Sequence, residues 1–195
     1  MRIGVIGVQG AVTEHIESVR KALARLNLRG EAIWIRKREQ LESASALIIP
    51  GGESTTISKL MSKNGLFENV KKLGEEGLPI MGTCAGLILL ARKVRGGVPG
   101  QSFLELLDVE VLRNAYGRQV DSFEAPITLT FSEKPFPGVF IRAPRILKVY
   151  GKAKPLAYHR EEVVGVEQGN LIGLSFHPEL SEDTRLHEYF IEKAR

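Results

Sequence analysis

Leu78-Pro79-Ile80-Met81-Gly82-Thr83-Cys84-Ala85-Gly86, followed by apolar residues over 87–91, predicts a short strand, a sharp turn and a helix. This is the pattern of a nucleophile elbow, with G-x-C-x-G in place of G-x-S-x-G. Glycines flank such a turn because its strained backbone brings neighbouring segments very close. A thiol at a helix N-terminus also lies near the positive end of the helix dipole, which favours the thiolate. Cys84 is therefore a candidate nucleophile; the alternative is a small buried cysteine in an α/β core.

A histidine and a carboxylate follow a second apolar strand, near the other end of the chain. Residues 171–176 predict a buried strand that runs into His177-Pro178-Glu179. In an extended segment, residues two apart point to the same side, and Pro178 restricts His177 to extended backbone. A thiol nucleophile needs a base, and the base needs a group that orients it. We therefore predict a Cys84-His177-Glu179 triad.

A pair of glycines follows another expected strand. Residues 46–49 are apolar and lead into Pro50-Gly51-Gly52-Glu53-Ser54-Thr55-Thr56. Two glycines at a strand end present unhindered N–H groups, which can stabilise the oxyanion of a tetrahedral acyl intermediate. The alternative is an ordinary Gly-Gly turn with Ser54 or Thr55 capping the next helix. Both interpretations can hold at once, since Gly52 can donate while Ser54 caps.

The alternation of strands and helices predicts an α/β fold. In the first half, apolar strands alternate with amphipathic helices, which indicates a mostly parallel sheet with helices on both faces. The second half predicts antiparallel strands and a closing helix. The expected strands cover 3–8, 32–35, 46–49, 78–81, 127–131, 139–141, 146–150, 163–166 and 171–176; the expected helices cover 12–26, 38–43, 54–63, 66–75, 87–91 and 183–193. Because function gathers at the carboxyl ends of parallel strands, we expect Gln9-Gly10, Gly51-Gly52, Cys84 and His177 at one rim.

Composition limits the remaining possibilities. A length of 195 residues with 43% hydrophobic residues suits one well-cored domain over 1–195. The net charge is +4, but basic residues are interspersed with acidic ones, as in Arg36-Lys37-Arg38-Glu39, so we expect no nucleic-acid partner. No apolar run approaches the roughly 18 residues of a membrane span. A strand begins directly after Met1, so no signal peptide is expected.

The single cysteine bears on location and on metal binding. One cysteine excludes an internal disulfide and fits a reducing cytosol, so we expect a cytoplasmic protein. The sequence contains neither a C-x-x-C pair nor an H-E-x-x-H motif, and we therefore predict no metal site.

Three motifs resemble the signatures of triad (class I) glutamine amidotransferases. They are Pro50-Gly51-Gly52-Glu53-Ser54, Gly82-Thr83-Cys84-Ala85-Gly86 and Ser175-Phe176-His177-Pro178-Glu179. More narrowly, the chain resembles the glutaminase subunits of pyridoxal 5′-phosphate synthases over essentially its whole length. The narrower resemblance rests on Gly7-Val8-Gln9-Gly10, the full 50–56 run, Asp121-Ser122-Phe123-Glu124 and Phe140-Ile141-Arg142-Ala143-Pro144.

The resemblance implies a flavodoxin-like, three-layer fold and an activity. It implies hydrolysis of L-glutamine to glutamate and ammonia, and transfer of the ammonia to a separate (β/α)8-barrel synthase subunit that makes pyridoxal phosphate. It implies no cofactor for this chain. Backbone N–H groups of Gly52 and Ala85 would form the oxyanion hole. The implied glutamine contacts are Gly52, Glu53, Ser54, Arg113, Ile141 and Arg142. Arginines suit this task because a guanidinium can grip a carboxylate with two hydrogen bonds.

Two other functions are compatible with parts of the sequence. One alternative is a redox-sensing, flavodoxin-like cysteine protein; another is a γ-glutamyl amidase or peptidase that acts alone. His15 and His187 fall in expected helices and His159 in a polar loop, so we expect surface or structural roles for all three. The expected core aromatics are Trp34, Tyr189 and Phe190.

Overall fold

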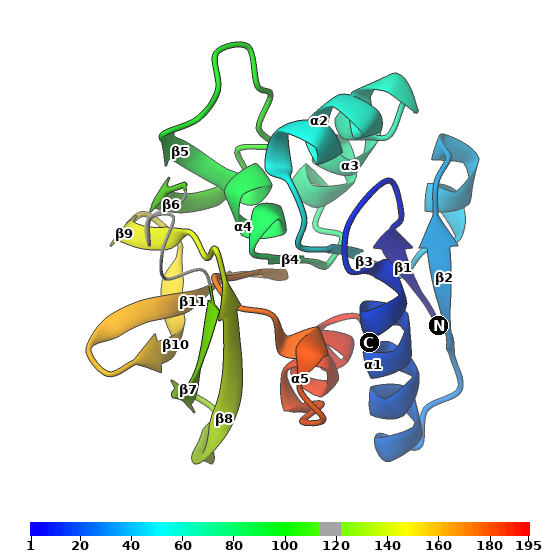
Figure 1. The fold of residues 1–195 in the computed structure, drawn as a ribbon. Helices are drawn as coiled ribbons and strands as arrows, with labels where there is room; N and C mark the ends of the chain where they lie inside the picture. The colour runs from blue at the N-terminus through cyan, green and yellow to red at the C-terminus, as the bar shows by residue number, and fades with distance from the viewer. Residues whose placement is uncertain (114–121) are drawn as a thin grey trace.

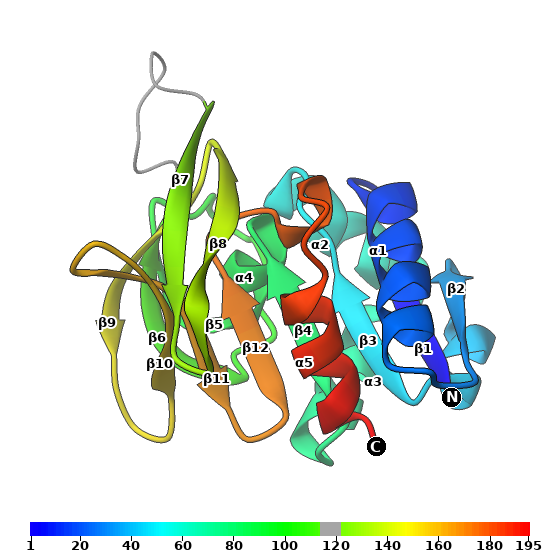
Figure 2. The same cartoon turned by 90° about the horizontal axis from the view of Figure 1, so that it is seen from below.

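Parallel strands form the first part of the main sheet. In the computed structural model, which describes residues 1–113 and 122–195, the strand order is β2-β1-β3-β4-β12-β11-β10-β7-β8 (Figures 1 and 2). The parallel part consists of β1 (Arg2–Ile6), β2 (Glu31–Ile35), β3 (Ala46–Ile49), β4 (Ile80–Thr83) and β12 (Leu171–Leu174). The antiparallel part consists of β7 (Ser122–Leu129), β8 (Ser132–Ile141), β10 (Lys154–His159) and β11 (Glu162–Gln168). The predicted mixed α/β sheet is confirmed.

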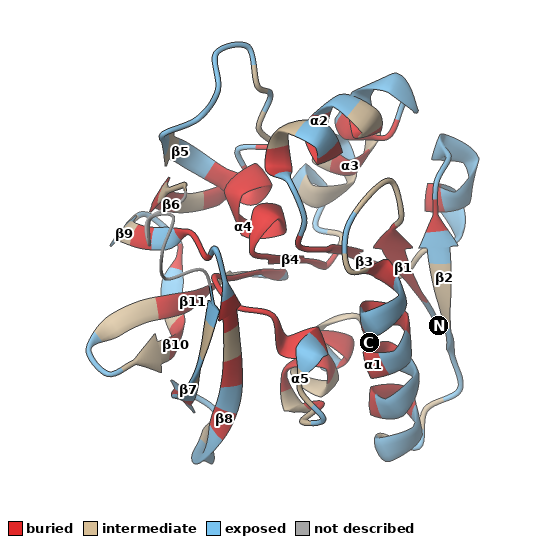
Figure 3. Ribbon diagram, viewed as in Figure 1, coloured by how far each residue is buried: buried red, intermediate tan, exposed pale blue. Residues whose placement is uncertain are grey.

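Helices cover both faces of the parallel part. Helices α1 (Val12–Arg25) and α5 (Arg185–Lys193) pack on one face, while α2 (Ser54–Lys63), α3 (Phe67–Glu75) and α4 (Ala85–Leu90) pack on the other (Figures 1 and 2). Each face has its own hydrophobic cluster. All four residues of β3 are buried (red in Figure 3), and so are all four of β12, as expected for parallel strands covered on both sides. The predicted three-layer arrangement is confirmed.

A second, smaller sheet was not predicted. It consists of β5 (Ala91–Arg95), β6 (Leu107–Leu112) and β9 (Arg145–Val149). Ala91, expected at the end of a helix, instead begins β5 directly after α4. Strand β5 carries three basic residues and is largely exposed, so it lacks the apolar pattern that identifies a strand.

The hairpin of β7 and β8 is longer than predicted. Pro126 pairs with Pro137 within it, so prolines that indicated strand ends lie inside the strands. Phe131, expected in a strand, lies in the turn between them. Strand β10 also escaped prediction, because it begins with Lys154 and Pro155. Asp121, which opens one of the motifs, lies outside the described residues.

Two 3-10 helices complete the described elements. They are η1 (Arg38–Ser43), as predicted, and η2 (Pro178–Leu180), which follows His177. Of the expected core aromatics, Phe190 is fully buried, but Trp34 is 39% exposed beneath the guanidinium of Arg36. Tyr189 is half-buried and stacks on Phe131. No helix among the described residues is both long enough and apolar enough to cross a membrane.

Candidate active site

Cys84 lies on a strained turn between β4 and α4. Its φ is +51°, in the left-handed region that non-glycine residues seldom occupy, and its backbone N–H donates to Leu174 O at 2.8 Å. A Cβ on Gly82 would lie 2.5 Å from the backbone of Gly86, and a Cβ on Gly86 would lie 2.1 Å from Ile49 O. The predicted elbow and its need for both glycines are confirmed.

His177 and Glu179 form a buried pair. The Nδ1 atom of His177 lies 2.7 Å from Oε1 of Glu179. The predicted contact is present, but the predicted backbone is wrong, because the chain turns into η2 at Pro178 instead of continuing extended. The backbone N–H of His177 donates to Val139 O at 2.8 Å, which fixes the start of this turn against β8.

The imidazole of His177 lies over Gly51, beside Cys84. A Cβ on Gly51 would lie 2.3 Å from Cε1 of His177 and 3.4 Å from Cβ of Cys84, so only glycine fits. Burial alone would lower the pKa of His177. Hydrogen bonds to Cys84 and Glu179, with the charges of both groups, outweigh burial and raise that pKa to about 10. The site therefore favours an imidazolium between a thiol sulfur and a carboxylate.

Glu53 caps helix α2, in contrast to the expectation for Ser54 or Thr55. Its carboxylate accepts hydrogen bonds from the backbone N–H groups of Thr55 at 2.9 Å and Thr56 at 2.8 Å. Burial would raise the pKa of Glu53, but these bonds and those of the threonine hydroxyls lower it to about 2. The Ser54 hydroxyl instead accepts from the Gln101 amide at 3.1 Å. Glu53 thus stays ionised at the mouth of the site.

The two candidate arginines differ in their surroundings. Arg113 is 13% exposed, and its guanidinium donates to Glu53 at 2.6 Å and to the Thr55 hydroxyl at 3.0 Å. Arg142 is exposed and has a φ of +44° directly after β8. Arg113 therefore belongs to a preformed ion pair, while Arg142 lies on the rim.

One cavity of about 540 Å³ brings the predicted residues together. Those that line it are Gly52, Glu53, Ser54, Cys84, Ala85, Arg113, Ile141, Arg142 and His177. Glu179 lies behind His177, away from the cavity. Gln9 and Gly10 also line it, so the expected gathering at one rim is confirmed. Leu180, 43% exposed, lines it too, although only its place directly after the His-Pro-Glu motif could have indicated this.

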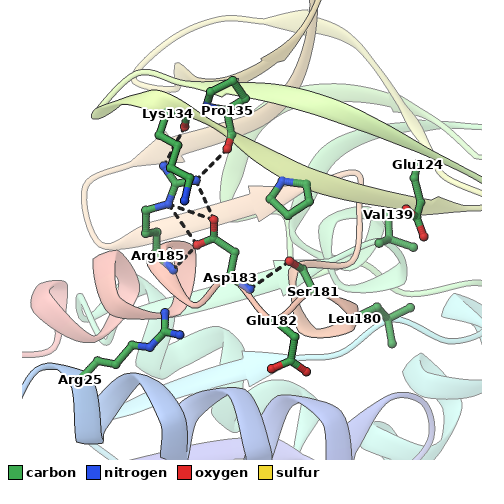
Figure 4. A pocket seen from close by; sticks show the side chains of 11 residues that line it. Arg25, Glu124, Lys134, Pro135, Val139, Leu180, Ser181, Glu182, Asp183 and Arg185 are labelled. Atoms are coloured by element: carbon green, nitrogen blue, oxygen red, sulfur yellow. Dashed lines mark hydrogen bonds and ion pairs between the residues drawn. The ribbon is translucent and has the colours of Figure 1, made fainter.

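A neighbouring cavity of about 630 Å³ has a different character (Figure 4). Its described lining contains neither cysteine nor histidine. The Arg185 guanidinium in its wall is held by Asp183 at 2.6 Å and by the carbonyls of Lys134 and Pro135. The hydrogen bonds to the two carbonyls tie the start of α5 to β8. Because its described lining offers neither a thiol nor an imidazole, this cavity is not the candidate reaction site.

The other histidines lie deeper than expected. His15 and His187 are fully buried, so a surface role is wrong for both, and His15 Nε2 lies 3.3 Å from Oε2 of Glu179. His159 ends β10, with its ring near those of Phe123 and Phe140. Among the described residues, no three His, Cys, Asp or Glu side chains are grouped to hold a metal ion.

Comparison with known families agrees with this geometry. A sequence model of the SNO glutamine amidotransferase family matches residues 5–195. The chain belongs to this family. Its relatives include proteins named pyridoxal 5′-phosphate synthase subunit PdxT. The one from Thermococcus onnurineus is 71% identical over 195 residues, covering 100% of this chain and 99% of the relative. The one from Pyrococcus abyssi is 65% identical and covers 100% of both chains.

Solved structures support the family fold. The crystal structure of a glutamine amidotransferase is 46% identical, with a TM-score of 0.87, and covers 98% of both chains. PurLQS from Thermotoga maritima is 17% identical, with a TM-score of 0.62, and covers 99% of this chain and 93% of that one. The second likeness concerns the fold alone. Together with the strand order, these matches confirm the flavodoxin-like class I amidotransferase fold.

Proposed function

We propose that this chain is the glutaminase subunit of a pyridoxal 5′-phosphate synthase, hydrolysing L-glutamine to L-glutamate and ammonia. The observation that carries the proposal is Cys84 on its strained elbow beside the His177–Glu179 pair, within a cavity of about 540 Å³. Family membership and the 71% identity to a synthase subunit support the same activity within that complex. The test is glutamate release measured with the synthase subunit present.

The reaction divides between three side chains. The Cys84 thiolate attacks the carboxamide carbon of glutamine, and His177 protonates the departing ammonia, leaving a γ-glutamyl thioester on Sγ. His177 then takes a proton from water; the hydroxide attacks the thioester, and Sγ leaves as thiolate while glutamate is released. Glu179 accepts the Nδ1–H of His177 throughout, which keeps the other ring nitrogen available to the reacting atoms.

The charges around the cavity suit a free amino acid. The ionised carboxylate of Glu53 can accept a hydrogen bond from the α-ammonium group of glutamine. The guanidinium groups of Arg113 and Arg142 can donate to its α-carboxylate. Ser54 and Ile141, from the same lining, complete the proposed contacts.

Loss of either arginine should weaken glutamine binding. For Arg142→Ala and Arg113→Ala we expect KM to rise roughly ten- to hundredfold, because one charge-assisted hydrogen bond is typically worth about 1.5–3 kcal/mol. The Arg113 variant also removes the ion-pair partner that holds the Glu53 carboxylate in place for the α-ammonium group. Its effect on KM should therefore be the larger of the two. Steady-state kinetics with varied glutamine measure this. Unchanged saturation curves in both variants would assign the arginines to surface or interface roles.

The peptide between Gly51 and Gly52 carries the proposed oxyanion donor. The Gly51 carbonyl accepts from the Ala11 N–H at 3.2 Å, and a Cβ on Gly10 would lie 1.8 Å from that oxygen. In a trans peptide the N–H and C=O point in opposite directions, so this contact also sets the direction of the Gly52 N–H. The φ of Gly52 is +157°. Glycine on both sides removes the steric cost of flipping this peptide, so the flip costs mainly the Ala11 hydrogen bond. Ala85 supplies the second proposed donor.

Turnover should depend on the synthase subunit. A free glutaminase would release ammonia into water, so we expect the partner to select the peptide orientation that directs Gly52 N–H at the oxyanion. One missing oxyanion donor costs about 10²–10³ in turnover, and the complex should exceed the isolated chain by that factor. Glutamate release at saturating glutamine, with and without the synthase subunit, measures it. Equal rates would favour the amidase that acts alone.

A matched pair of glycine variants separates the hinge from general strain. Gly52→Ala should impair activation by the partner more than it impairs folding. Gly65 also has a positive φ, of +66°, but a Cβ added there would meet no atom of the described residues within 4 Å. Gly65→Ala should therefore lower stability alone and leave the activation ratio unchanged.

The partner is a (β/α)8-barrel synthase subunit, as the resemblance implies, and the protein acts in the cytoplasm as a single domain over 1–195. The continuous sheet from β2 to β8 supports one domain. A redox-sensing protein fits this site less well. It would oxidise at Cys84 with no need for His177, whereas these two side chains interact here.

A further inference from the structure

Two buried histidines lie behind the triad carboxylate. His15, on α1, and His187, on α5, are both 0% exposed. The Nδ1 atom of His15 lies 3.1 Å from Nε2 of His187. The Nε2 atom of His15 lies 3.1 Å from the Thr83 hydroxyl and 3.3 Å from Oε2 of Glu179. Glu179 thus has His177 at one oxygen and His15 at the other.

The second oxygen of Glu179 needs a donor. Within the described residues, Oε2 is buried and makes no aligned hydrogen bond. A buried carboxylate oxygen without a donor is costly, because burial removes the water that would otherwise solvate it. His15 Nε2 is the ring nitrogen that faces Oε2, at 3.3 Å.

The hydrogen-bond network assigns the proton of His15. Burial lowers the pKa of His15 against the upward pull of Glu179, so the ring is neutral and carries one N–H. The Nδ1 atom of His187 has no partner among the described residues. A buried N–H without an acceptor is rarer than a buried acceptor without a donor. The His187 proton therefore belongs on Nε2, which donates to His15 Nδ1. The His15 proton then lies on Nε2, which is 3.1 Å from the Thr83 hydroxyl and 3.3 Å from Oε2 of Glu179, so both oxygens share this one donor.

We propose that His15 is a positioning residue for the glutaminase reaction, whose Nε2–H holds the Glu179 carboxylate ionised and directed at His177. His187 fixes the tautomer of His15 by donating to its Nδ1. The inference rests on the proposed function. It adds a buried Cys84-His177-Glu179-His15-His187 series, in which the last two members never touch the substrate.

The charges that face His15 come from three elements. Glu179 and His177 lie on and beside η2, His187 lies on α5, and Glu14 precedes His15 on α1 itself. Of these, Glu179 is in contact with the side of the ring that carries the proposed proton. Burial would raise the pKa of Glu179, whereas the hydrogen bond and charge of His177 lower it. A neutral His15 adds to this lowering through the dipole of its Nε2–H, which lies 3.3 Å from Oε2. Removing His15 should therefore move the titration of Glu179 to higher pH.

The test compares two replacements of His15. In His15→Leu the donor is lost, and we expect the acidic limb of the kcat/KM profile to move up by about one pH unit. His15→Gln places an amide N–H near the position of Nε2 and should restore most of the wild-type profile. Val19→Ala, one helical turn further along the same buried face of α1, is the matched control. It should lower stability and leave the limb in place.

Alkylation of the thiol by iodoacetamide separates this inference from the proposed function. Cys84 is the only cysteine, so the rate reports on one thiol and needs no glutaminase activity. The acidic limb of the alkylation rate should shift in His15→Leu as the kcat/KM profile does. Unshifted limbs in His15→Leu would overturn the inference while leaving the glutaminase assignment untouched. If His15→Leu does not fold, His187→Leu carries the test: a smaller shift in the same direction is expected, and no shift overturns the inference.

Discussion

Replacing Cys84 by alanine should lower glutamate release by about 10⁴- to 10⁶-fold, as loss of a triad nucleophile does. The thiol is the only sulfur nucleophile of the chain, and it ends the elbow inside the cavity. Alanine keeps the Cβ and loses only Sγ, which contacts Ile141 O weakly at 3.8 Å and interacts with the imidazole of His177. The fold should therefore remain, and the loss should appear in kcat. The assay is glutamate release at saturating glutamine with the synthase subunit present.

Two controls accompany this variant. Cys84→Ala should still bind glutamine in calorimetry and unfold within a few degrees of the wild type, since the deleted atom contributes little packing. A diazo-ketone analogue of glutamine should add one equivalent of mass to the wild type and none to the variant. Appreciable turnover by Cys84→Ala would show that another group attacks the amide.

The elbow was predictable because its causes are local. Gly82 and Gly86 are close in sequence to Cys84, and the turn they permit is set by backbone contacts within a few residues and with β3. The parallel sheet was predictable for a related reason, since buried strands such as β3 and β12 are apolar at every position.

The cap of α2 and the turn after His177 show where local patterns fail. Serine is a common N-cap, yet Glu53 takes that role because its longer side chain reaches the N–H groups of Thr55 and Thr56 while pairing with Arg113. That pairing joins residues 60 apart in sequence, which a local pattern cannot reveal. Likewise, Pro178 does restrict the backbone, but it begins a 3-10 turn instead of extending a strand.

The role of His15 could not be predicted from its position on an amphipathic helix. On α1 it occupies the buried face, where a histidine usually serves packing. Its contacts with Thr83, Glu179 and His187 join it to residues that lie 68 to 172 positions away in the chain. Only the sheet order, which brings α1 and α5 together on one face, creates this group.

His177→Asn should cost about as much activity as Cys84→Ala, because triad members act as a unit. The asparagine amide is too weak a base to take a proton from the thiol or from water. Glu179→Gln keeps the size of the side chain but loses its charge, so its cost should be about 10- to 100-fold smaller than that of His177→Asn. His159→Asn, a histidine outside the cavity, is the matched control and should retain wild-type turnover. Comparable rates for wild type and His177→Asn would exclude the triad.

The pH dependence of Glu179→Gln tests the role of the carboxylate directly. The pKa of His177 is raised to about 10, so its imidazolium form persists below that pH and is lost above it. The stability that this raised pKa contributes is complete below the ordinary value of 6.5 and disappears as pH rises through about 10.

Protonation of ammonia requires the imidazolium, so the alkaline limb of kcat/KM should lie near pH 10 in the wild type. Removing the Glu179 charge removes part of what raises the pKa of His177, and the limb should move down towards 6.5. A limb that stays in place in Glu179→Gln would show that Cys84 alone sets the pKa of His177, and that Glu179 only orients the ring.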